Sequence, residues 1–229
     1  MMSLSARYRF WCWRKYWSER EIRLAAKLAK PGTLCLDIGA NAGAYSYFMQ
    51  SAGATVHAFE PIPELATRLR ERFSSRLTVH QLGISDRAGQ FEIKVPLING
   101  QPAYGLASVE QSWPEDQSVT HKIETRTLDS FAFENVSLLK IDIEGHEAAA
   151  LRGALETLAR CRPALIIEAE DRHKPGAVAE VWSLLKPLGY GGSFSSNGQS
   201  CDITQFDVAR HQRAFGDRDY VFNFVFRAL

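Results

Sequence analysis

The chain has 229 residues, 45% of them hydrophobic, and a formal net charge of +1. This length suits one α/β domain with an embellishment, and a net charge so close to zero predicts no nucleic-acid partner. No uninterrupted apolar stretch of about 20 residues predicts a transmembrane helix. The four cysteines are scattered singly, form no zinc-binding pattern and fit a reducing, cytoplasmic location.

The first 30 residues are both basic and aromatic. Eight basic residues stand against only Glu19 and Glu21, and the interleaved aromatic residues are Trp11, Trp13, Tyr16 and Trp17. One interpretation is an interfacial helix that binds a membrane surface or an anionic polymer. We favour the other, helices packed on the domain with buried Trp rings and solvated Arg heads, because charge runs are usually solvated faces. We expect a helical segment over 1–30 and the main domain over 31–229.

A strand, a glycine turn and a helix are predicted over 33–50. The apolar run 33–38 is typical of a buried parallel strand, and the order D-x-G-x-N-x-G then leads into a helix from Ala44. Such a turn holds a nucleotide-like ligand at the carboxyl edge of a doubly wound sheet. Asp37 would repel a pyrophosphate but suits the cationic amino-acid end of S-adenosylmethionine. The predicted cofactor-binding residues of this turn are Asp37, Gly39, Ala40, Asn41, Gly43 and Ser46.

Two further strand ends contribute to the same expected site. The run 55–59 reads as a strand that ends in Glu60 and Pro61. A carboxylate there can accept both ribose hydroxyls, and hydrogen bonds to a charged group contribute roughly 1.5–3 kcal/mol each. A helix over 63–73 and a strand over 77–82 follow. We expect Ile84 against the adenine face, with Ser85 or Asp86 near its polar edge.

An insertion is predicted over about 90–127. The runs 91–95 and 119–127 alternate like paired strands, and 99–116 reads as a long irregular loop. Such loops in compact domains often act as lids or binding loops, although a loop without function is equally compatible with the pattern.

The stretch 138–147 is the second informative one. An apolar strand ends in Asp142, a predicted helix covers 148–160, and the strand 164–170 carries Glu168. A helix over 178–188 and strands over 189–194 and 219–227 complete the chain. Charged groups are rarely buried without partners, so we expect Asp142, Glu168 and His146 to line a site.

Two mechanisms are open at this stage. An ordinary histidine has a pKa of about 6.5, which makes His146 a candidate general base for an acceptor hydroxyl, although an exposed helical histidine is a common alternative. Asp142 and Glu168 could instead hold a divalent metal such as Mg²⁺, which would acidify that hydroxyl. The metal ligands therefore stay undecided.

Taken together, the sequence resembles the FkbM family of S-adenosylmethionine-dependent methyltransferases. The segments that carry the resemblance lie between residues 33 and 170, and they are 37–43, 59–61, 83–86, 127–131, 140–147 and 151–154. The resemblance implies a Rossmann-like class I methyltransferase fold, with a doubly wound, mostly parallel seven-stranded sheet whose last strand is antiparallel. It also implies O-methylation of a small molecule, a sugar or another glycan, or a secondary metabolite.

Two rival functions remain. The fold could serve as a non-catalytic module that binds S-adenosylmethionine, although the acids at Asp37, Glu60 and Asp142 argue against this. A nicotinamide-dependent oxidoreductase is disfavoured because the third glycine of G-x-G-x-x-G is missing. A homodimer is left open.

Overall fold

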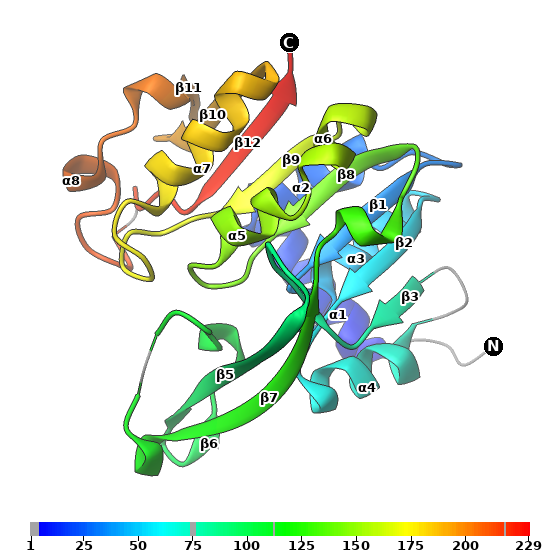
Figure 1. Ribbon diagram of the computed structural model, residues 1–229, viewed down its shortest axis with the longest axis vertical. Helices are drawn as coiled ribbons and strands as arrows, with labels where there is room; N and C mark the ends of the chain where they lie inside the picture. The colour runs from blue at the N-terminus through cyan, green and yellow to red at the C-terminus, as the bar shows by residue number, and fades with distance from the viewer. Residues whose placement is uncertain (1–4, 74–76, 112, 218) are drawn as a thin grey trace.

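The computed structural model describes residues 5–73, 77–111, 113–217 and 219–229. Within these ranges the chain forms a large eight-stranded sheet with the order β11-β10-β12-β9-β8-β1-β2-β3 (Figure 1). Its parallel part consists of β1 (Leu34–Ile38), β2 (Thr55–Phe59), β3 (Leu77–His80), β8 (Val136–Ile141) and β9 (Ala164–Glu168). Residues 1–4 of the predicted N-terminal segment and Ser112 of the predicted loop lie outside the described residues.

The remaining strands of this sheet belong to the C-terminal part of the chain. The last strand, β12 (Asn223–Ala228), is antiparallel to both β9 and β10 (Tyr190–Ser196). This confirms the predicted doubly wound, mostly parallel sheet with an antiparallel last strand. β11 (Gln199–Asp202) pairs with β10 at the edge and adds an eighth strand within the described residues.

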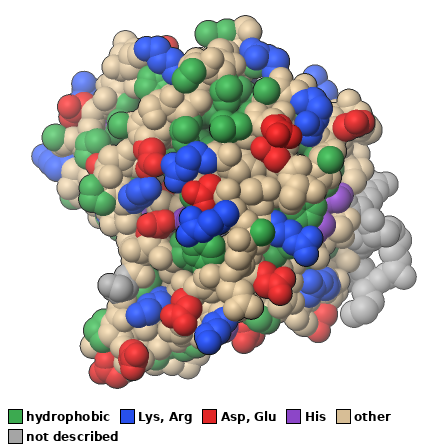
Figure 2. All heavy atoms as spheres, viewed as in Figure 1, with side chains coloured by type: hydrophobic (Ala, Val, Ile, Leu, Met, Phe, Trp, Pro, Cys, Tyr) green, Lys and Arg blue, Asp and Glu red, His purple; other side chains and the backbone are tan. Residues whose placement is uncertain are grey.

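Helices cover both faces of the large sheet because its parallel strands are apolar on both sides. One face carries α2 (Arg20–Leu28), α3 (Ala44–Ser51) and α4 (Pro63–Arg72). The other carries α5 (Glu147–Arg152), α6 (Leu155–Cys161) and α7 (Ala177–Leu185) (Figure 1). Neighbours along one strand enter opposite cores, as Leu138 and Leu139 do in β8. The surface over α5, α6 and α7 mixes acidic and basic side chains (Figure 2).

The predicted single helix over 148–160 is wrong, because it divides at Gly153. A Cβ atom on Gly153 would overlap the carbonyl oxygen of Ser85, so the chain passes this point only as glycine. The carboxylate of Asp129 then accepts hydrogen bonds from the backbone N–H groups of Glu156 (3.0 Å) and Thr157 (2.8 Å). This cap stabilises the new helix start of α6.

The predicted insertion forms a second sheet within the described residues. Its order is β4-β7-β5-β6, and the strands are β4 (Gly83–Ile84), β5 (Gly89–Ile98), β6 (Gln101–Pro102) and β7 (Ser118–Arg126). The predicted pairing of 91–95 with 119–127 is confirmed by the antiparallel β5–β7 register. The irregular loop predicted from residue 99 is wrong at its start. Asn99 and Gly100 have φ angles of 51° and 72° and form a two-residue hairpin turn.

The insertion sheet is attached to α4 through its own small core, which contains Ile62, Leu65, Ile93, Val95, Ala107 and Ile123. In Figure 1 it extends away from the large sheet, below the carboxyl ends of the central strands. Short helices complete the described chain, namely η1 (Tyr104–Leu106), η2 (Glu115–Gln117), η3 (Asp129–Phe131), η4 (Lys186–Leu188), η5 (Ile203–Gln205) and α8 (Val208–His211).

The N-terminal residues form α1 (Ala6–Ser18) and α2, both packed on the domain. α1 buries Tyr8 and Cys12, which confirms the expected packing of this segment on the domain. The expected burial of the Trp rings is wrong for Trp13 and Trp17, which are 55% and 62% exposed. Among the described residues, no helix combines the length and the apolar character needed to cross a bilayer.

Candidate functional site

A cavity of about 590 Å³ opens at the carboxyl edge of the large sheet. It lies between that edge, the insertion sheet, α1 and residues 215–217 and 220–222. Because parallel strands all end at the same edge, residues far apart in sequence meet here. Eight of the predicted site residues line this cavity: Gly39, Asn41, Glu60, Pro61, Ile84, Asp142, His146 and Glu168.

The other five predicted residues are buried behind the cavity wall and are Asp37, Ala40, Gly43, Ser46 and Ser85. Asp37 Oδ2 accepts hydrogen bonds from the backbone nitrogen (3.0 Å) and the Oγ atom (2.5 Å) of Ser46. Burial raises the pKa of Asp37 to about 6, although these bonds oppose the shift. The carboxylate thus supports the first turn of α3, which differs from the expected direct contact with a cationic ligand.

Two glycines fix the course of the turn after β1. Gly39 has a φ of 79°, and a Cβ atom there would overlap the carbonyl oxygen of Asp142 on the neighbouring strand. Gly43 has a φ of 84°, and its Cβ would lie 2.7 Å from side-chain atoms of both Leu69 and Phe73. Both positions need glycine because of backbone conformation and close packing. The turn can therefore lie flat against β8 and expose backbone groups to the cavity.

Glu60 joins the glycine turn to the end of β2. Its Oε2 accepts from the backbone nitrogen of Asn41 (2.8 Å) and its Oε1 from that of Ile62 (3.0 Å). Burial raises the pKa of Glu60 to about 7, against the effect of these two bonds. A carboxylate oxygen has two lone pairs, so each oxygen can accept one more hydrogen bond from a ligand in the cavity.

A buried lysine that the sequence analysis missed balances the acids of this edge. Lys140 is 1% exposed, and its Nζ lies 3.6 Å from Asp142 Oδ2 and 3.9 Å from Glu168 Oε2. Burial alone would lower the pKa of Lys140, but the two carboxylates outweigh it and raise that pKa. Burial, and then the charge of Asp142, raise the pKa of Glu168 well above its usual range. A lysine within an apolar strand was the available signal, since buried lysines need partners.

The acids continue into a second cluster beside the first. Glu144 accepts from His173 Nε2 at 2.7 Å, and Glu170 lies 3.2 Å from the same nitrogen. Despite burial, these two carboxylates raise the pKa of His173 to about 9. Ligand atoms lie within 4.8 Å of one another in the set Asp142, Glu144 and Glu168 and in the set Glu144, Glu170 and His173.

His146 lies where the sheet edge meets the insertion. Its Nε2 is 2.9 Å from Ser85 Oγ, and its Nδ1 is 2.6 Å from Glu110 Oε1. Glu110 lies in the insertion loop, which is fastened locally because Ser108 Oγ donates to the carbonyl oxygen of Glu144 (2.7 Å) and accepts from the Glu110 nitrogen (3.0 Å). No sequence pattern pointed to Glu110, because its partner is 36 residues away.

The opposite wall of the cavity is largely apolar. The insertion contributes the side chains of Phe91, Ile93, Tyr104, Leu106, Val109 and Ile123. Tyr220 and Phe222 line it from the C-terminal part, and Lys15 and Glu19 line it from α1 and its C-terminal cap. The cavity therefore combines an acidic sheet edge with an apolar insertion wall, which suits a ligand with a charged half and an apolar half.

Comparison with known proteins agrees with this geometry. Residues 37–191 match the family described as the Methyltransferase FkbM domain. The chain is 29% identical over 161 residues to the 2-O-methyltransferase NoeI of Sinorhizobium fredii, covering 61% of this chain and 65% of NoeI. It is 30% identical over 196 residues to the 31-O-demethyl-FK506 methyltransferase FkbM of Streptomyces tacrolimicus, covering 70% and 74%. The chain thus spans slightly less than two thirds of NoeI.

Solved structures show the same fold at low sequence identity. The crystal structure of methyltransferase FkbM from Methylobacillus flagellatus KT matches with a TM-score of 0.55 and 18% identity, covering 85% of this chain and 43% of that one. A Streptococcus mutans protein solved in complex with SAH matches with a TM-score of 0.53 and 11% identity, covering 91% and 96%. Since the family match spans more than half of the sequence, this chain belongs to the FkbM methyltransferase family.

Proposed function

We propose that the protein is an S-adenosylmethionine-dependent O-methyltransferase that acts on a hydroxyl group of a sugar or another small molecule. The observation that carries this proposal is a single cavity with Glu60 on the sheet edge and His146 where that edge meets the insertion. Family membership supports methyl transfer, and two relatives are named as methyltransferases that act at a 2-O or a 31-O position.

The side chains of the sheet edge fit the cofactor. Glu60 can accept hydrogen bonds from both ribose hydroxyls while it keeps its bonds to Asn41 and Ile62. Asp142 and Glu168 would lie near the cationic amino-acid end, and Ile84 offers an apolar surface for the base. When bound, S-adenosylmethionine supplies a methyl group already activated by its sulfonium. The protein then has to orient the acceptor, which is worth up to about 7–11 kcal/mol in well-placed cases.

His146 is the proposed general base. Glu110 accepts a hydrogen bond from Nδ1–H, which leaves the lone pair of Nε2 directed at Ser85 Oγ. Ser85 Oγ also lies 3.3 Å from Asp86 Oδ1, so its proton has a second acceptor. Nε2 can take the proton of an acceptor hydroxyl once the Ser85 side chain rotates and its Oγ leaves the line of this lone pair.

A divalent metal is not required by this arrangement. The carboxylates of Asp142, Glu144 and Glu168 are hard oxygen ligands of the type that Mg²⁺ prefers. However, the ammonium of Lys140 already lies beside two of them, so this edge has less negative charge left for a divalent ion than for the single ammonium of an amino-acid end. We therefore expect turnover to persist after treatment with EDTA.

The test has two parts. S-adenosylhomocysteine is titrated into the protein by calorimetry, and S-adenosylhomocysteine release from S-adenosylmethionine is then measured over a panel of sugar and macrolide hydroxyls. We expect saturable binding that Glu60→Ala weakens, and release with at least one acceptor class. Binding without release from any acceptor would favour the non-catalytic module, and absence of binding would contradict both functions.

A further inference from the structure

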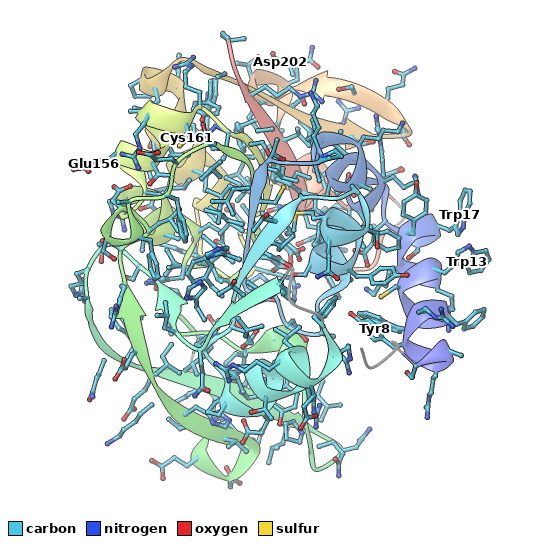
Figure 3. All side chains as sticks on the ribbon, turned by 90° about the vertical axis from the view of Figure 1, so that its right-hand side faces the viewer. Tyr8, Trp13, Trp17, Glu156, Cys161 and Asp202 are labelled. Carbon is cyan, nitrogen blue, oxygen red and sulfur yellow. The ribbon has the colours of Figure 1, made fainter. Side chains whose placement is uncertain are left out.

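The outward face of α1 carries three large aromatic side chains that methyl transfer does not use. Phe10, Trp13 and Trp17 are 59%, 55% and 62% exposed. Their spacing places them on one helix face, and neighbouring ring centroids lie 5.9 Å and 6.3 Å apart. Figure 3 shows Trp13 and Trp17 projecting away from the body of the molecule, whereas Tyr8 points towards it. We call Phe10, Trp13 and Trp17 the aromatic row.

The inner face of α1 fixes the row in this outward position. Tyr8 is buried, its hydroxyl donates to the carbonyl oxygen of Ala42 (2.8 Å), and the Arg72 guanidinium lies 4.2 Å above its ring. Cys12, one helical turn further on, is fully buried. The row cannot turn inward without breaking these contacts, so its exposure is a property of the docked helix.

Positive charges lie on both sides of the row. At 100° per residue, the exposed Arg7 and Arg14 fall on one side of it and the exposed Arg9 on the other. Among the described residues, none of these three guanidinium groups has a carboxylate within salt-bridge distance. The acid nearest in sequence on this helix end, Glu19, pairs with Lys15 at 2.5 Å.

We propose that α1 docks on the surface of a membrane that contains anionic phospholipids. Exposed Trp and Phe rings partition into the headgroup region, while long Arg side chains reach lipid phosphates. A second copy of this chain is the less suitable occupant. Around a twofold axis the arginines of both copies would face one another and repel.

Docking in this way would bring the cavity close to the bilayer. Lys15 of the same helix and Glu19, the residue that caps its C-terminus, line the cavity on the side of the helix opposite to the row. A helix with its side chains is about 10–12 Å across, so the cavity would lie within roughly that distance of the headgroups. This goes beyond the proposed methyl transfer and predicts an acceptor presented at a membrane surface.

The experiment is co-sedimentation of the full chain with vesicles of phosphatidylcholine alone and of phosphatidylcholine mixed with phosphatidylglycerol. We expect binding to the anionic vesicles only, weakened by salt. The double variant Trp13→Ser, Trp17→Ser should lose about tenfold or more in apparent affinity, and so should Arg7→Glu, Arg14→Glu. Matched controls are Ile98→Ser, which removes a side chain 53% exposed on the insertion, and Lys122→Glu, both expected to bind like the wild type.

The folding control is S-adenosylhomocysteine affinity, which should stay within about twofold in every variant because the row lies outside the cavity. Unchanged vesicle binding by the Trp variant, or absence of binding by the wild type, would overturn the proposal. Sedimentation velocity tests the alternative that a second copy of this chain covers the row. A wild-type dimer that dissociates in the Trp variant would assign the row to a second copy and likewise overturn membrane docking.

Discussion

The two walls of the cavity are built in different ways. The sheet-edge wall consists of strand ends and tight turns, in which Gly39 and Asn41 have φ angles of 79° and 47° and Glu60 is 4% exposed. The insertion wall consists of apolar side chains on a hairpin sheet with its own small core. A substitution in the sheet-edge wall disturbs the main sheet, whereas a substitution in the insertion wall can leave the main sheet intact. This difference suits a constant donor and a variable acceptor.

The largest expected effect concerns the point where the walls meet. His146→Ala removes the proposed base, and we expect kcat to fall by about 10²–10⁴ while S-adenosylhomocysteine affinity changes little. Steady-state kinetics and calorimetry measure the two quantities. His121→Ala, on the β7 strand, is the matched control. If both histidine variants keep wild-type kcat, the proton is accepted elsewhere.

Glu110 extends this test to the insertion wall. Glu110→Ala should lower kcat more than Glu110→Gln, because glutamine keeps an oxygen that can accept a hydrogen bond from Nδ1–H of His146. Equal losses in both variants would indicate that the carboxylate charge, and not orientation of the ring, is what matters.

The close packing of the sheet-edge wall is tested by comparing a glycine substitution within it with one outside it. Gly39→Ala introduces both left-handed strain and overlap with the Asp142 carbonyl oxygen, whereas Gly100→Ala at a φ of 72° meets nothing within 4 Å. Strain alone should cost about 1–3 kcal/mol of unfolding free energy in each variant. Gly39→Ala should lose more than that and should also lose S-adenosylhomocysteine binding. Equal denaturation midpoints for the two variants would contradict the close packing of β1 on β8.

A smaller effect should appear in the pH dependence of donor binding. The raised pKa of Glu60, about 7, means that the apo protein holds much of this group protonated below neutral pH. If the ionised form accepts the ribose hydroxyls, affinity should rise by up to about tenfold from roughly pH 6 to 8. Glu60→Gln should bind more weakly and show a flatter profile. An affinity that falls as the pH rises would have the wrong sign for this role.

The smallest effect on binding of the methyl donor is expected for a substitution in the insertion wall. Phe91→Leu should change the KM for the acceptor several-fold, because similar-sized apolar replacements usually cost less than about 1.5 kcal/mol. S-adenosylhomocysteine affinity should not change. A loss of donor binding in this variant would show that the walls do not divide the ligands as we propose.

The same contrast explains what could be predicted from the sequence. The strand-turn-helix at 33–50 and the acids at Glu60, Asp142 and Glu168 are local patterns. The fold and the sheet-edge wall of the cavity could therefore be predicted from the sequence. The role of Glu110 could not be predicted, since it arises from a contact with His146 across the insertion. The hairpin at Asn99–Gly100 had a sequence signal that was overlooked, because Asn-Gly favours positive φ at both turn positions. Asp37 fitted a cationic ligand by charge alone, whereas its burial could be seen only in three dimensions.

The most direct measurement is a crystal structure with S-adenosylhomocysteine bound. We expect the ribose hydroxyls within hydrogen-bonding distance of Glu60, and the amino-acid end beside Asp142 and Glu168. Density for the ligand at another place, or a Glu60 carboxylate turned away from the ribose, would contradict the assignment of the sheet edge to the methyl donor.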